Sequence, residues 1–267
     1  MRLPLFQIDA FTSQLFGGNP AAVVLLEQWL PDAVLAAIAA ENNLAETAFI
    51  IPRPGVVPLR WFTPTVEMDL CGHATLAAAD VLFRHYLPSA ERLTFSTRSG
   101  NLMVTRDGGR LALDFPARPG KPIAIAESLV SALGARPREA FLARDLLAIF
   151  DSEAEVRALR PDFPRIASLE AFAVIVSAPG ESVDFVSRFF APGAGVPEDP
   201  VTGSAHCTLV PYWAARLGKT VLAAKQLSAR GGDLWCRLAR DRVVISGRAV
   251  EYLRGEITVD IERLQAE

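Results

Sequence analysis

The feature that most limits the fold of this chain is a motif that occurs twice. Residues 67–81 read EMDLCGHATLAAADV, and residues 198–211 read EDPVTGSAHCTLVP. At an offset of 131 residues the two stretches share a glutamate, a glycine and an alanine, and a Phe and a Pro precede each copy. Self-similarity at a period near half the chain length indicates two similar lobes. We therefore expect two related halves.

Each copy of the motif leads into an apolar segment with the composition of a helix, Gly72 to His85 in the first half and Ser204 to Arg216 in the second. A helix that is apolar on most of its sides is buried. Short strand-like segments separated by turns surround both helices along the sequence. The predicted fold class is α+β, with two pseudo-symmetric lobes, each an antiparallel barrel-like sheet around a central helix.

A linker is predicted where three prolines and a glycine fall between Pro116 and Pro122. Proline- and glycine-rich stretches of this kind often separate compact parts of a chain. The predicted division is an N-terminal lobe at 1–116 and a C-terminal lobe at 117–267.

The composition excludes several classes of protein. About half of the residues are apolar and the net charge is −3, with Lys and Arg scattered along the chain, so we expect no nucleic-acid surface. No apolar run reaches the roughly 20 residues that a membrane span needs, and the N-terminus does not read as a secretory signal. Three cysteines without paired spacing argue against a disulfide framework and against a zinc site. We expect a cytoplasmic protein with no membrane partner and no metal.

The second copy of the motif contains a candidate anion site. Gly203 and Ser204 stand at a helix start, where backbone N–H groups and the helix dipole attract an anion. Asp199 beside them could accept or donate a proton. Ser, Thr and Asp are also favoured as helix caps, so an acidic turn that only caps the helix is the alternative. The repeat favours a site, because two glycine-led helix starts that face each other can hold one anionic ligand.

Several motifs in the same order resemble the PhzF family of phenazine-biosynthesis-like isomerases, over essentially the full length. They are IDAF with GGNPAAVV near the start, NLAETAFI at 43–50, RWFTPTVEMDLCGHAT at 60–75, LDFPARP at 113–119, EDPVTGSAHC at 198–207 and SARGGDLW at 228–235. The resemblance implies the fold of diaminopimelate epimerase, with the active site in the cleft between two lobes, and a homodimer. It also implies an isomerase that moves a proton within a small carboxylated substrate, such as a dihydro-hydroxyanthranilate, without metal or organic cofactor.

The resemblance assigns catalytic roles to three residues. The family's catalytic glutamate matches Glu46, which would be the general acid and base. Its DPxTGS aspartate matches Asp199, and its GH motif places His73, so these two would orient the substrate or share the proton relay. A proton that leaves one carbon and returns to another needs a single group that acts as both base and acid.

Four further residues are assigned to substrate binding. Gly72, Gly203 and Ser204 would supply N–H and hydroxyl donors, which lower the barrier when they are held where charge develops. Asn19, in the Gly-Asn-Pro turn, either forms the turn or contributes to the wall of the cleft.

Two alternatives remain open from the sequence. Diaminopimelate epimerase and proline racemase use two cysteines, one of which precedes a glycine much as Cys71 precedes Gly72. The second copy has Thr202 in that place and Cys207 falls inside the helix, so a cysteine-dependent racemase would lack its second thiol. The other alternative is a non-catalytic small-molecule-binding protein that kept the fold.

Overall fold

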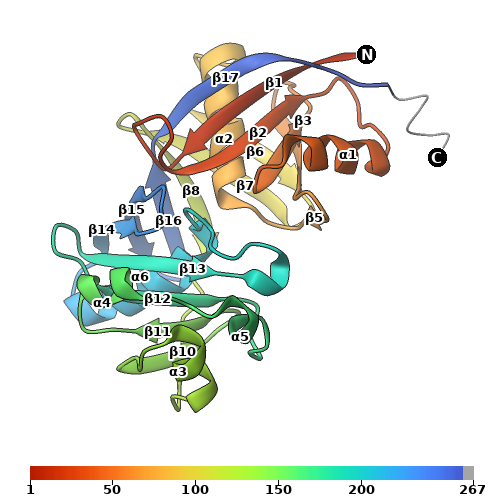
Figure 1. Ribbon diagram of the computed structural model, residues 1–267. Coiled ribbons are helices and arrows are strands. Elements are labelled where there is room, and N and C mark those ends of the chain that lie inside the picture. Colours follow the sequence, from red (N-terminus) through yellow and green to blue (C-terminus); the bar gives the residue numbers. More distant parts are fainter. Residues whose placement is uncertain (261–267) are drawn as a thin grey trace. The chain divides into compact units, whose positions relative to one another are not determined.

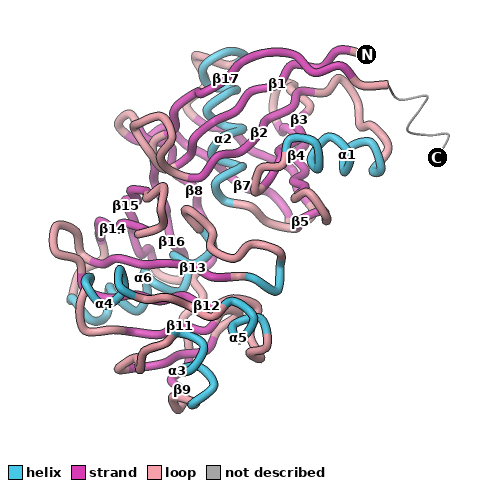
Figure 2. Tube along the Cα trace, viewed as in Figure 1, coloured by secondary structure: helices cyan, strands magenta, loops and turns pink. Residues whose placement is uncertain are grey.

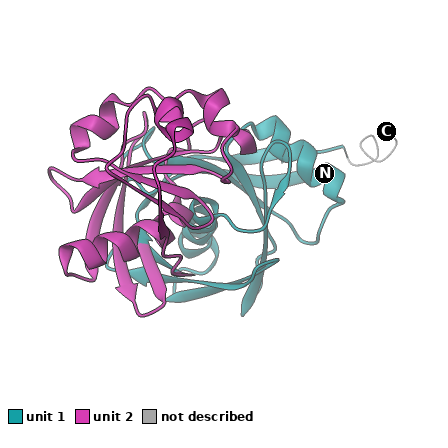
Figure 3. Ribbon diagram, turned by 90° about the horizontal axis from the view of Figure 1, so that it is seen from below, with its two compact units in different colours: residues 1–114, 246–267 teal, residues 115–245 magenta. Residues whose placement is uncertain are grey.

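The computed structural model describes residues 1–260, which fall into two compact units (Figure 3). Unit 1 comprises Met1–Asp114 together with the segment that begins at Ser246, and unit 2 comprises Phe115–Ile245. The first boundary lies close to Pro116, where the sequence predicted it. The C-terminal segment differs from the predicted division into 1–116 and 117–267, since it groups with unit 1, and positions 261–267 lie outside the described residues. The reason is that strand β17 (Ala249–Thr258) pairs with β1 (Arg2–Ala10) along its length.

Strands are the commonest regular structure in both units (Figure 1; Figure 2). The further strands of unit 1 are β2 (Asn19–Leu25), β3 (Glu46–Ile50), β4 (Val56–Phe62), β5 (Glu67–Met68), β6 (Arg92–Thr97), β7 (Gly100–Asp107) and β8 (Arg110–Pro116), which runs into the boundary. Its helices are α1 (Asp32–Asn42) and α2 (Gly72–Val81), and α2 continues into one π-helical turn, η1 (Leu82–Tyr86).

Unit 2 contains eight strands, several short helices and one long helix, α6. The strands are β9 (Lys121–Ile123), β10 (Glu139–Leu142), β11 (Leu146–Ile149), β12 (Val174–Pro179), β13 (Phe185–Phe190), β14 (Val221–Gln226), β15 (Gly232–Ala239) and β16 (Arg242–Gly247), which crosses the second boundary. The helices are α3 (Glu127–Leu133), α4 (Glu153–Ala158), α5 (Phe163–Ala167), the 3-10 turn η2 (Pro192–Ala194) and α6 (Gly203–Leu217). Strand β9 begins inside the predicted linker and pairs with β10.

The order of strand pairings is the same in the two units. In unit 1, β1–β2 is antiparallel, β2–β3 parallel, β3–β4 antiparallel, β4–β6 parallel and β6–β7 antiparallel. In unit 2, β10–β11 is antiparallel, β11–β12 parallel, β12–β13 antiparallel, β13–β14 parallel and β14–β15 antiparallel. Helices α2 and α6 occupy the same place in these two series, between the strands of the second parallel pair. The repeat seen in the sequence therefore extends to the topology of each unit.

The sequence predicted an antiparallel barrel-like sheet in each lobe, and the antiparallel pairs of each unit are joined by two parallel pairs. A parallel pair needs a crossover connection, and helices supply it. Helix α1 connects β2 to β3, and helix α6 connects β13 to β14. Strand patterns along the sequence do not distinguish such crossovers from long hairpin connections.

Helix α2 is buried, as predicted, and α6 is buried except at its exposed last turn and a few partly exposed positions. Every residue of α2 from His73 to Val81 is buried. It packs against β1, β2 and β3, while α6 packs against β14 and β15. A second apolar cluster in each unit lies under the outer helices, for example Leu35 of α1 with Phe49 and Phe62 in unit 1. Among residues 1–260, no helix has the length and apolar character needed to cross a bilayer.

The repeated glutamate has the same partner type in both units. Glu67 accepts two hydrogen bonds from Arg60, at 2.7 and 2.8 Å, and Glu198 accepts two from Arg188, at 2.8 and 2.9 Å. Each arginine comes from the strand before the motif, and its guanidinium lies over a phenylalanine two residues further on. Bidentate pairs of this kind fix geometry as well as adding energy. They tie the start of each motif to its sheet.

Candidate active site

Four side chains of unit 1 meet where β2, β3 and α2 begin. Asn19 is the first residue of β2 and Glu46 the first of β3. These strands are parallel, with Ala21 opposite Glu46, so both begin at the same edge of the sheet. Helix α2 packs on these strands and starts at Gly72, which places His73 in its first turn.

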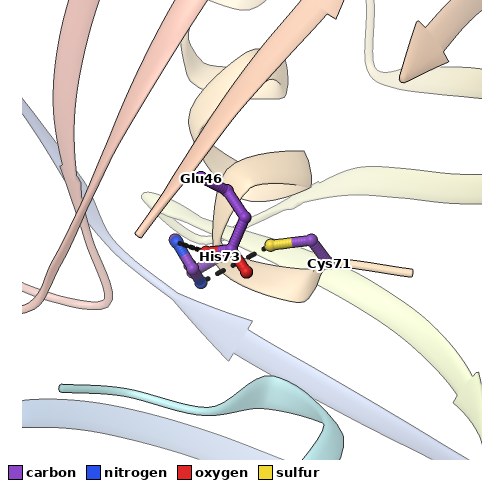
Figure 4. Close-up of side chains that lie close together, drawn as sticks. All are labelled: Glu46, Cys71 and His73. Atoms are coloured by element: carbon purple, nitrogen blue, oxygen red, sulfur yellow. Dashed lines mark hydrogen bonds and ion pairs between the residues drawn. The ribbon is translucent and has the colours of Figure 1, made fainter. Parts of the chain in front are cut away.

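The imidazole of His73 lies at the centre of the group (Figure 4). Its Nε2 is 3.1 Å from Oε2 of Glu46. On the other side of the ring, Nδ1 lies 3.1 Å from Nδ2 of Asn19 and 3.6 Å from Sγ of Cys71. Asn19, Cys71 and His73 are buried, and the Glu46 side chain is 13 % exposed. We call these four residues the His73 cluster.

The backbone before Asn19 requires a glycine. Gly18 has φ of +62°, and a Cβ placed there would lie 2.1 Å from the carbonyl oxygen of Ala10. Only glycine tolerates both the left-handed conformation and that close approach. The chain thereby turns into β2 with Asn19 wholly buried. Asn19 therefore does more than form a turn, because its side chain reaches His73.

The entry into β3 is also set by local structure. Helix α1 ends with Asn43 in the left-handed conformation, whose N–H bonds to the Ala39 carbonyl. The chain then reverses into β3, and the amide of Asn42 donates a hydrogen bond to the Thr47 hydroxyl. These contacts place Glu46 at the edge of the sheet.

The tautomer of His73 depends on Asn19. The Nδ2 group of an asparagine can only donate, so in this orientation Nδ1 of His73 must accept and a neutral ring carries its proton on Nε2. The protonated Nε2 then lies on the side of the ring that faces Glu46, with 3.1 Å between Nε2 and Oε2. If the ring is doubly protonated, Nδ1 becomes a donor, and the Asn19 amide must turn to present its oxygen.

Burial and nearby charge act on His73 in opposite directions. Burial disfavours the charged ring, but the acidic side chains beside it, Cys71 and Glu46, outweigh burial and raise the pKa of His73 above its ordinary value. Burial, with the charge of Glu46 adding to it, raises the pKa of the Cys71 thiol to about 11. The thiol is therefore neutral near pH 7, and Glu46 is the partner that favours a charged His73 there.

The alternative that the motif is only an acidic turn capping its helix does not fit the contacts at the starts of α2 and α6. Among the described residues, no side chain caps the N-terminus of α2 or of α6. The hydroxyl of Thr202, at the cap position of α6, instead donates to Oδ2 of Asp199 at 2.5 Å. The hydroxyl of Ser204 accepts from Arg144 at 3.3 Å. Neither hydroxyl satisfies a first-turn N–H group.

A second group of predicted site residues lies in unit 2, and hydrogen bonds to Gln226 fix its position. The Gln226 side chain is fully buried and accepts from the Thr202 N–H at 2.9 Å. Its amide donates to the Asp199 carbonyl at 2.7 Å and to the Thr202 hydroxyl at 3.2 Å. Asp199 is thus fixed from two sides, just before Gly203 begins α6.

The predicted site residues therefore form two sets. Asn19, Glu46, Gly72 and His73 come together in unit 1, and Asp199, Gly203 and Ser204 come together in unit 2. Sequence reasoning missed Gln226 and Arg144, which contact the second set. Both lie far from the motif along the chain, and no spacing pattern pointed to them.

Comparisons with known proteins agree with the motifs. A family profile described as phenazine biosynthesis-like protein, PhzC-PhzF, matches residues 8–255. The chain is 54 % identical over 258 residues to an uncharacterized isomerase of Pseudomonas aeruginosa, covering 96 % of this chain and 99 % of that one. Both findings confirm the resemblance that the sequence predicted.

Solved structures give the same result. A PhzF-family phenazine biosynthesis protein from Enterococcus faecalis is 48 % identical, with a TM-score of 0.95 over 97 % of this chain and 100 % of that one. A hydroxyproline epimerase from Agrobacterium vitis is 13 % identical, with a TM-score of 0.62 over 97 % of this chain and 93 % of that one. The second likeness concerns the fold alone. It agrees with the predicted epimerase-like fold class.

Proposed function

Because the chain belongs to the phenazine biosynthesis-like protein family, we propose that it is a cofactor-independent isomerase that moves a proton on a small carboxylated substrate. A cyclic substrate of the dihydro-hydroxyanthranilate type is the first candidate. The observation that carries the proposal is the contact between Glu46 and His73 inside a largely buried cluster, with 3.1 Å between Oε2 and Nε2. The isomerase name of the Pseudomonas aeruginosa relative is consistent with it.

Glu46 is the general acid and base of the proposed reaction. Its carboxylate takes a proton from a substrate carbon, the electron pair of the broken C–H bond moves into the conjugated system, and the carboxyl group returns the proton at another carbon. His73 holds the carboxylate through Nε2, and Asn19 supports the ring from the opposite side. A positioned acid–base group contributes typically about 10²–10⁴ in rate.

Donors at the helix starts have a binding role in this proposal. In unit 1, the first-turn N–H groups of α2 at Gly72 bind substrate oxygen. In unit 2, Asp199 orients polar groups of the substrate, and Gly203 and Ser204 donate hydrogen bonds to those groups. Support comes from the absence of a side-chain cap at either helix among the described residues. Preorganised donors are most effective where charge develops during the reaction.

The test is incorporation of deuterium from heavy water. The protein is incubated with cyclic and amino carboxylic acids, including dihydro-hydroxyanthranilate, and mass shifts are read. Label or isomerised product should appear with the wild type and fall about 10²-fold or more in Glu46→Gln. Glu41→Gln, a change at an exposed glutamate of α1, is the matched control and should behave as wild type.

The two alternatives give different outcomes. Full turnover by Glu46→Gln would show that Glu46 is not the general acid and base. Loss of activity on alkylation of Cys71 would favour a thiol-dependent racemase. Tight ligand binding without proton exchange, unaffected by Glu46→Gln, would favour a binding protein. Cytoplasmic location and a homodimer stay predictions.

A further inference from the structure

The His73 cluster also contains a set of metal-ligand atoms. Glu46, Cys71 and His73 each offer one such atom, a carboxylate oxygen, a thiol sulfur and an imidazole nitrogen, and these atoms all lie within 4.8 Å of one another. Within residues 1–260, no other group of three or more such side chains shares this spacing. Figure 4 shows the three side chains converging from β3 and from the start of α2.

The spacing of the cysteine and the histidine suits coordination to one ion. In a tetrahedral zinc site the sulfur and nitrogen ligands lie about 3.5 Å apart, given their bond lengths to the metal. Sγ of Cys71 is 3.6 Å from Nδ1 of His73. Glu46 faces the other ring nitrogen, Nε2, at 3.1 Å. With one ring nitrogen taken for the histidine, the three ligand atoms still lie within 4.8 Å of one another, and an ion bound between them would draw them closer.

The kind of ligand selects the kind of metal. Thiolate and imidazole together favour Zn²⁺ over Mg²⁺ or Ca²⁺, which prefer oxygen ligands. Three protein ligands leave the fourth position of a tetrahedral site open to water or to a substrate oxygen. Binding would release the S–H proton of Cys71 to solvent, since the thiolate is the ligand.

We propose that Glu46, Cys71 and His73 form a site for Zn²⁺ and that zinc bound there inhibits the enzyme. The ion engages the carboxylate and the imidazole, which are then no longer available to move a proton. The inhibitory consequence rests on the proposed function, whereas the metal site rests on the ligand geometry alone. The two parts are therefore tested separately.

The binding test uses Co²⁺ as a spectroscopic probe of the full chain, freed of metal by dialysis against a chelator. Cobalt bound to a thiolate gives a sulfur-to-metal charge-transfer absorption in the near ultraviolet. We expect this band in the wild type, its disappearance on adding stoichiometric Zn²⁺, and its absence in Cys71→Ser. The Zn²⁺ affinity of Cys71→Ser, measured by calorimetry, should fall by at least roughly tenfold.

A matched variant controls for the other thiols. Cys207 is also a buried free cysteine, but it lies in α6 outside this group. Cys207→Ser should keep the band and the affinity of the wild type. Circular dichroism of each variant establishes that it is folded before titration.

Three outcomes would overturn the metal site. They are no charge-transfer band with excess Co²⁺, a band that persists in Cys71→Ser, and Zn²⁺ affinity that is unchanged by His73→Ala. Deuterium exchange that depends on Glu46, combined with no metal binding, would reject the metal site and leave the proposed function standing. Metal binding without any deuterium exchange would reject the proposed function and leave the metal site standing. Exchange that continues at saturating Zn²⁺ would reject the inhibition.

Discussion

Nε2 of His73 lies 3.1 Å from Oε2 of Glu46, and both side chains are largely buried. One comes from the first turn of a helix and the other from the start of a strand. The carboxylate favours the charged form of the imidazole and contributes to the raised pKa of His73. Stability and activity should therefore both respond to changes at this pair.

Removal of His73 should alter the pH dependence of stability. The pKa of His73 is raised in the folded protein above its ordinary value of about 6.5. A raised pKa contributes stability that is fully present below the unfolded value and is lost as pH rises through the folded value. The difference in free energy of unfolding between wild type and His73→Gln should therefore be largest near pH 6 or slightly below and shrink toward alkaline pH. Urea unfolding at a series of pH values measures it, and parallel profiles for the two proteins would contradict the prediction.

The other buried histidine of a central helix should show the opposite dependence. His206 is fully buried in α6, Nδ1 lies 2.9 Å from the Thr202 carbonyl oxygen, and burial lowers its pKa to about 4. The unfolded chain binds a proton at this residue near pH 6.5, so stability falls as pH drops from there toward 4. The loss is on the order of 3 kcal/mol. His206→Gln should show a shallower decline over this range in urea unfolding. An unchanged slope would mean that His206 is not buried neutral.

The cysteines should resist alkylation in the folded protein. All three are buried and free, and burial raises the pKa of both Cys71 and Cys207 to about 11. Because the thiolate is the reactive species, iodoacetamide at neutral pH should label the native chain slowly. It should label all three cysteines rapidly in denaturant, as mass spectrometry can count. Fast, selective labelling of Cys71 in the native state would instead support a thiol-dependent mechanism.

Gln226 should be required for the stability of unit 2. Its side chain makes three hydrogen bonds, to Asp199 and Thr202, while fully buried. Gln226→Leu removes these bonds and leaves the buried Thr202 N–H without its partner, at a cost of about 1–3 kcal/mol. Thermal or urea unfolding should show this loss. Gln14→Leu, at an exposed glutamine, should stay within about 0.5 kcal/mol of wild type. Equal effects of the two changes would show that the Gln226 bonds contribute little.

Much of the fold could be predicted from the sequence. The repeat at 67–81 and 198–211 indicated two similar parts, and both buried central helices were expected from their apolar composition. The crossovers that make the sheets mixed, and the return of β17 to unit 1, were not predicted. Both depend on which strands pair at long range, and local strand patterns do not encode that choice.

For the candidate site, the sequence by itself determined which residue types stand at which positions. Motif resemblance selected Glu46, His73 and Asp199, and the glycine before Asn19 required a turn. Only the tertiary structure decided that Asn19, Cys71 and Glu46 surround one imidazole and that Gln226 holds Asp199. Contacts between residues far apart in the chain arise when parallel strands and a helix begin at the same edge of a sheet. Their distances, burial and protonation follow from that packing, since each depends on neighbours that the linear order does not specify.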